Sequence, residues 1–161
     1  AERAAAEEVR HARVMARLVR RYGGQVTSPC EGPMEVRSLL SLAIENAQEG
    51  CVRETYGALV AWIQSASATE PHLRRALQAI AAEETDHAKL AFAVSEFCMS
   101  RLSDREQADV LLAQRDAVSE LSNELLDSPP TELQVRLGLP SAAVAARLVT
   151  QAKIELWSMA A

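Results

Sequence analysis

Apolar side chains recur every three or four residues along most of this chain, which is the pattern of α-helices with one buried face. Glycine and proline fall mainly between these periodic stretches, in residues 23–34 and 128–130. The pattern predicts an all-α fold: an antiparallel helix bundle with extra C-terminal helices, in one domain over residues 1–161. The predicted helices cover residues 2–22, 35–67, 71–101, 103–127, 131–138 and 141–159.

Predicted caps mark several of the helix ends. Gly23 and Gly24 are expected to end the first helix. Ser103 with Glu106 is a capping box for the fourth helix, and Thr131 with Gln134 is expected to cap the short one. Pro140 and Ser141 are expected to open the last helix.

The composition narrows the classes of function. The chain has 161 residues, is 48% hydrophobic and 4% aromatic, and carries a net charge of −5. Without a basic block, this charge argues against binding nucleic acid through bulk electrostatics. No apolar run reaches the length of about 20 residues that a membrane span needs. Cys30, Cys51 and Cys98 are an odd number without a Cys-x-x-Cys spacing, so we expect a reducing, cytoplasmic environment.

One eight-residue pattern, Ala-Ala-Glu-Glu-x-x-His-Ala, occurs twice, at residues 5–12 and 81–88. Each copy contains Glu-x-x-His, so a carboxylate and an imidazole share one helix face. Both pairs fall on the predicted apolar stripe of their helix, where an ionised carboxylate is costly unless it is paired or binds a cation. The pattern therefore predicts metal ligands; the alternative is a core histidine bonded to a neighbouring glutamate. The predicted ligands are Glu8, His11, Glu84 and His87.

Further carboxylates are available in the predicted second helix. We counted residues along the two helices from the connection between them. Glu49 is level with His87 to within one helical turn, and Glu54 is level with Glu84. Glu45 lies more than one helical turn too far from the connection. An α-helical period places Glu49 on the core-facing stripe. We therefore favour Glu49 as the fifth ligand, with Glu54 as an alternate ligand or a partner of one.

Three other residues of the second helix have a predicted role. Tyr56, on the stripe of Glu49, is expected to be a core aromatic or to donate a hydrogen bond to a metal ligand. Gly50 and Gly57 each cost about 1 kcal/mol relative to alanine in a helix. That cost predicts close approach of a neighbouring helix at both positions.

Together these motifs resemble the ferritin-like di-iron carboxylate superfamily. The resemblance rests on Glu8-x-x-His11, on Gln-Glu-Gly-Cys-Val-Arg-Glu-Thr-Tyr at 48–56, and on Glu84-x-x-His87. The order is similar to that in rubrerythrins and in the di-iron hydroxylases of tRNA modification and ubiquinone biosynthesis. The nearest likeness is to uncharacterised bacterial ferritin-like proteins with Glu-Gly-Cys-Val-x-Glu-Thr. It covers residues 2–100.

The chain departs from the superfamily at its start. The superfamily's bundle opens with a helix that carries one more glutamate well before the first Glu-x-x-His, whereas seven residues precede Glu8 here. Four explanations stay open: the chain is a fragment, a partner subunit such as a second copy donates the helix, Glu120 or Glu124 fills the place, or the site is incomplete. A homodimer is one expectation that follows.

The resemblance implies a function. It implies a cytoplasmic oxidoreductase that holds two iron ions, or a manganese–iron pair, in a carboxylate-rich site that suits hard cations. Such a protein uses O₂ to oxidise a small organic substrate. The alternatives are a ferroxidase or iron-handling protein, and a metal-free helical scaffold with an incomplete site.

Overall fold

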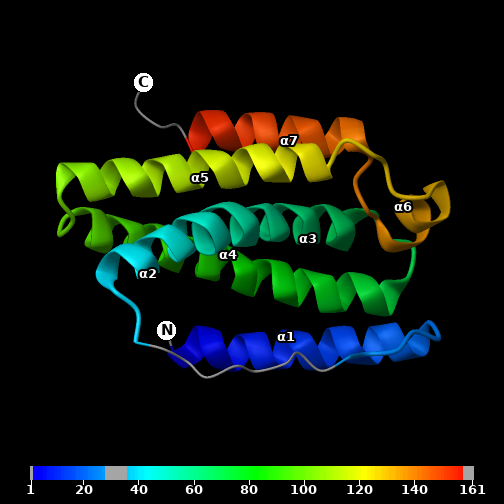
Figure 1. The fold of residues 1–161 in the computed structure, drawn as a ribbon. Coiled ribbons are helices and arrows are strands. Elements are labelled where there is room, and N and C mark those ends of the chain that lie inside the picture. The colour runs from blue at the N-terminus through cyan, green and yellow to red at the C-terminus, as the bar shows by residue number, and fades with distance from the viewer. Residues whose placement is uncertain (1, 28–35, 158–161) are drawn as a thin grey trace. The chain divides into compact units, whose positions relative to one another are not determined.

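The computed structural model describes residues 2–27 and 36–157 (Figure 1). The described residues form helices and their connections, without a strand, so the predicted all-α class is confirmed for them. In these ranges no helix is long and apolar enough to cross a membrane. The chain divides into unit 1, Ala1–Arg37, and unit 2, Ser38–Ala161. Unit 2 contains segments from both sides of residue 101, where the superfamily resemblance ends.

Parts of some predictions lie outside the described residues. These are the loop from residue 28 to 34, the start of the second helix at Glu35, the end of the last helix at 158–159, and Cys30.

Unit 1 is built on helix α1, Glu2–Arg21. Gly23 follows with φ +79°, a left-handed conformation that glycine adopts without a steric penalty. The Gly23 N–H donates to Arg20 O at 3.1 Å, and the Gly24 N–H donates to Val19 O at 2.9 Å. These bonds satisfy carbonyls of the last turn, so the predicted glycine stop is confirmed.

Unit 2 begins with a long helical stretch made of three segments. They are α2 (Leu39–Glu45), the π-helix η1 (Asn46–Glu54) and α3 (Thr55–Ser67). The Ser38 hydroxyl caps α2 by accepting from the Ser41 N–H at 3.0 Å. After a short turn the chain returns antiparallel as α4 (Pro71–Met99), with proline at its first position as predicted.

The prediction of one regular α-helix is wrong over Asn46–Glu54, where the π-helix has a wider turn. Tertiary hydrogen bonds support this segment from two sides. The Asn46 Nδ2 donates to Ala91 O of α4 at 2.9 Å. The Trp157 Nε1 donates to Cys51 O at 2.7 Å in a buried contact. Both bonds come from residues far away in the sequence, which helical periodicity does not report.

The second half of unit 2 adds α5 (Asp104–Glu124), α6 (Thr131–Leu137) and α7 (Ala142–Glu155). The predicted capping box is confirmed: the Ser103 N–H donates to Glu106 Oε2 at 2.9 Å, and the Glu106 N–H donates to Ser103 Oγ at 3.5 Å.

The predicted cap of α6 is wrong. Pro130 occupies the cap position, and the Gln134 side chain donates to Pro129 O at 2.7 Å. The fixed φ of proline is compatible with the position just before the first residue of a helix. The other predicted ends hold: Gly138 ends α6 with φ +67°, and the Ser141 hydroxyl caps α7.

Two clusters of buried apolar side chains hold unit 2 together. One joins η1, α5 and α7 through Val52, Ala117, Val118, Leu121, Val149, Ala152 and Trp157. The other joins α2, η1, α4 and α5 through Ala43, Ala47, Cys98, Leu102 and Val110.

Close helix approach is confirmed at Gly50 and wrong at Gly57. A Cβ on Gly50 would lie 2.7 Å from Ala91 Cβ, whereas a Cβ on Gly57 would meet nothing within 4 Å. We therefore expect Gly50→Ala to lower the free energy of unfolding by about 1–3 kcal/mol through overpacking. Gly57→Ala, the matched control, should raise it by about 0.5–1 kcal/mol. Urea denaturation followed by circular dichroism measures both, and equal effects would contradict this assignment.

Candidate metal centre

The first Glu-x-x-His pair lies on α1 in unit 1. The Nδ1 of His11 and the Oε1 of Glu8 are 3.6 Å apart. The spacing of three residues brings the two side chains onto one face of the helix. A carboxylate oxygen and an imidazole nitrogen are therefore close enough to be directed at one point.

The second pair lies on α4 in unit 2 and repeats this arrangement. The Nδ1 of His87 and the Oε2 of Glu84 are 3.5 Å apart. Donor atoms at this separation can both bind one ion at a metal–ligand distance of about 2.1 Å. Each predicted pair thus has a local geometry that fits metal binding. That the two pairs share one metal site stays a prediction.

Glu49 takes a different direction from the one predicted. Its side chain is 65% exposed, and its Oε1 lies 3.9 Å from Arg53 Nε. The expectation that Glu49 lies on the core-facing stripe is therefore wrong. The π-helical turn changes the angle between successive side chains, so a stripe counted with the α-helical period does not continue through η1.

Arg53 also binds α5. Its Nη1 and Nη2 donate to the two carboxylate oxygens of Glu124 at 3.0 and 2.9 Å. Glu120 Oε2 lies 3.7 Å from Arg53 Nη2. Hydrogen bonding lowers the pKa of Glu124 and raises that of Arg53. The favoured ligand Glu49 and both candidates for the missing place, Glu120 and Glu124, therefore surround one guanidinium group.

Contacts between η1 and α4 also revise the predicted positions of Glu49 and Glu54 along the helix axis relative to α4. Gly50 is level with Ala91, which follows His87 by one helical turn. Glu49 thus lies about one turn beyond His87. Because the two helices are antiparallel, Glu54 lies near the level of His87.

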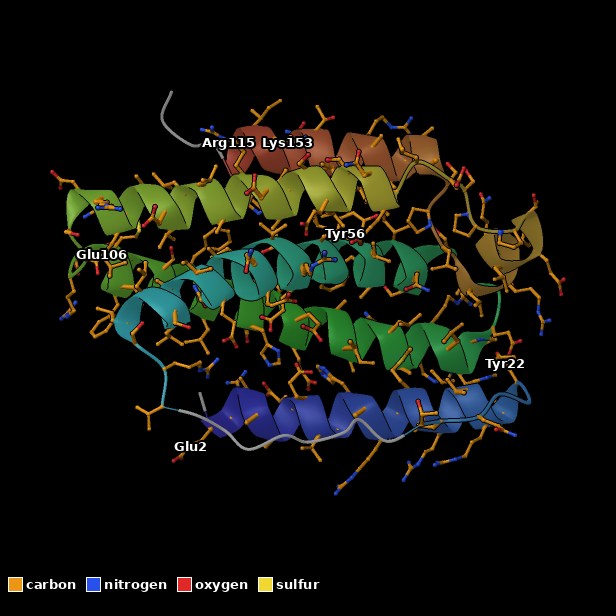
Figure 2. All side chains as sticks on the ribbon, viewed as in Figure 1. Glu2, Tyr22, Tyr56, Glu106, Arg115 and Lys153 are labelled. Atoms are coloured by element: carbon orange, nitrogen blue, oxygen red, sulfur yellow. The ribbon has the colours of Figure 1, made fainter. Side chains whose placement is uncertain are left out.

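Tyr56 packs against the apolar cluster of η1, α5 and α7, as predicted for a core aromatic (Figure 2). Its hydroxyl is buried without a hydrogen-bond partner among the described residues, and the same holds for the hydroxyl of Thr55. Desolvation raises the pKa of Tyr56. The alternative role, a hydrogen bond to a metal ligand, stays a prediction.

Sequence reasoning assigned no role to Asn46 or Arg53, although both position η1. The Asn46 Nδ2 donates to Ala91 O and also lies 3.6 Å from Cys51 Sγ. Neither residue belongs to a recognisable motif. One signal could have found them: both are polar residues in a helical segment whose other residues contact two neighbouring helices.

Comparison with family models, with curated proteins and with solved structures finds no match to this chain. The assignment of the site therefore rests on its residues and their geometry.

Cys51, within η1, provides a chemical test of this geometry. Burial raises the pKa of its thiol from 9.0 to about 11, the negative charge of Glu54 adds to the rise, and hydrogen bonds with Ser95 and Asn46 oppose it. Alkylation needs the thiolate. We therefore expect iodoacetamide at pH 8 to modify Cys51 at least about 100-fold more slowly in the folded protein than in urea.

Peptide mass spectrometry measures the two rates, and similar rates would contradict the buried position of this thiol.

The raised pKa of Cys51 also has a consequence for stability. Because the folded-state pKa is raised, this contribution to the free energy of unfolding is present below pH 9 and is lost as the pH rises toward 11.

Proposed function

We propose that Glu8, His11, Glu84 and His87 together supply the ligands of a two-metal site in a ferritin-like bundle, where the protein uses O₂ to oxidise a small organic substrate. One observation carries the proposal. The same donor pair occurs on two helices with nearly the same separation, 3.6 Å on α1 and 3.5 Å on α4. The resemblance to the di-iron carboxylate superfamily supports the same assignment.

The donor set suits iron. Carboxylates are hard oxygen donors and imidazole is a borderline nitrogen donor, which is the combination that non-haem iron and manganese accept. When bound, the metal pair supplies electrons for the reduction of O₂. The residues of this chain would hold the metals: the carboxylates of Glu8 and Glu84 would offset cationic charge, and the ring nitrogens of His11 and His87 would complete the donor set.

A fifth ligand from η1 completes the proposed set. Glu54 lies near the level of His87, so it is better placed along the helix than Glu49. Glu49 would have to leave Arg53 before it could bind a metal. Because Glu49 is 65% exposed and its contact with Arg53 is long, at 3.9 Å, the cost of separating the pair is small. We therefore propose Glu54 as the ligand and Glu49 as a carboxylate available for exchange.

A metal-free scaffold is the second candidate. The observation that favours it is the cluster around Arg53, where Glu49, Glu120 and Glu124 are engaged by one cation. If these carboxylates remain with Arg53, the chain retains the two Glu-x-x-His pairs and few further ligands. Metal analysis distinguishes the candidates, because a scaffold would contain no iron, manganese or zinc near stoichiometric levels.

The decisive change removes one pair, in the variant Glu84→Ala, His87→Ala. We expect the unmodified protein, loaded anaerobically with Fe(II), to retain iron through gel filtration and to develop a near-ultraviolet charge-transfer band on exposure to O₂. The double variant should lose the band and most of the iron, because two of the five proposed ligands are gone. Mass spectrometry of bound metal and absorption spectroscopy measure both effects.

The chain offers a matched control in its other Glu/His pair. His72 Nε2 lies 3.1 Å from Glu70 Oε2 at the start of α4, outside the duplicated motif. Glu70→Ala, His72→Ala removes the same kinds of side chain and should leave iron binding unchanged. Retention of the band in the Glu84→Ala, His87→Ala protein, or its equal loss in both variants, would contradict the proposed ligands.

A further inference from the structure

A groove runs between α5 and α7 of unit 2. Figure 2 labels two of its lining residues, Arg115 and Lys153. It consists of two adjoining cavities of about 550 and 410 Å³. Ser122 and Lys153 line both of them, so the cavities form one continuous groove along the two helices. The two halves differ in chemistry.

The larger half is polar and cationic. Arg115, Ser119, Asn123 and Lys153 line it above Trp157. Figure 2 labels Arg115 and Lys153 close together, near the C-terminal end of α7. None of the described residues that line this cavity is a carboxylate, although the chain carries a net charge of −5. Its composition therefore favours an anion.

Arg115 and Lys153 differ from three cations of unit 2 that are paired with carboxylates. Arg53 binds Glu124 at 2.9 Å, Arg136 binds Glu132 at 3.1 Å, and Lys89 binds Asp86 at 3.0 Å. Within the described ranges, Arg115 and Lys153 have no ion pair with a carboxylate. The Lys153 Nζ donates to Ser122 Oγ at 3.3 Å. The two charges are thus available to a ligand.

The smaller half is apolar. Leu125, Leu126, Ala146 and Val149 line it, and Leu126 is 73% exposed. From Lys153 to Ala142 at the far end, α7 extends about 16 Å. An aliphatic chain lying here would cover apolar surface that is otherwise in water. The groove therefore combines a cationic end with an apolar channel in line with it.

We propose that this groove binds a medium-chain aliphatic carboxylate, with its head group at Lys153 and Arg115 and its chain along Leu125 and Val149. Charge complementarity selects the head group. Each methylene fully removed from water strengthens binding up to about fourfold. The proposal is independent of the metal site, because none of the proposed metal ligands lines the groove.

Trp157 lines the groove and provides a local signal, once the other tryptophan is removed by Trp62→Phe. In this background we expect decanoate, below its micelle concentration, to change the fluorescence saturably. Acetate and decanol, which lack the chain and the charge respectively, should bind at least tenfold more weakly. Lys153→Ala should weaken decanoate binding at least tenfold, whereas Lys89→Ala should leave it unchanged.

A second measurement keeps the test independent of any variant's folding. Lys89 and Lys153 are the only lysines of the chain, so amine labelling followed by mass spectrometry reports on both at once. Decanoate should protect Lys153 at least fivefold and leave Lys89 unprotected. Equal protection of both lysines, equal binding of decanol, or binding to anionic phospholipid vesicles without binding of decanoate would overturn the proposal.

Discussion

The packing of unit 2 depends on how the π-helical segment η1 is held between its neighbours. A π-helix is rarely stable by itself, because its hydrogen-bond geometry is poorer than that of an α-helix. Here Asn46 ties it to α4 through Ala91 O, and Trp157 binds Cys51 O from the C-terminal side. Gly50 allows α4 to approach closely. Three different contacts therefore fix a segment that the local sequence alone would form as an α-helix.

The π-helical segment separates the carboxylates considered as metal ligands into two groups. The π turn directs Glu49 toward Arg53, where Glu120 and Glu124 also lie, and a shared cation balances their charges. The regular helices α1 and α4 keep a glutamate and a histidine on one face. The first group is a surface ion-pair network, of modest value for stability. The second has the donor types and spacing that metal binding needs.

Trp157 connects the π segment with the groove between α5 and α7. Its indole nitrogen bonds to the η1 backbone, and its ring forms part of the groove wall. The same residue belongs to the apolar cluster that joins η1, α5 and α7. A ligand in the groove would therefore contact a side chain that also holds the core, which gives the groove a rigid base on one side.

Interactions between residues close together in the sequence determined much of this structure. The helical class, the glycine stop after α1, the capping box of α5 and the side-by-side placement of each Glu-x-x-His pair all depend on residues a few positions apart. The tertiary structure alone decided the π-helix, the outward direction of Glu49, the partners of Arg53 and the groove of Lys153. Each of these depends on contacts between residues distant in the sequence, such as Trp157 with Cys51, and a periodic pattern along one helix carries no information about them.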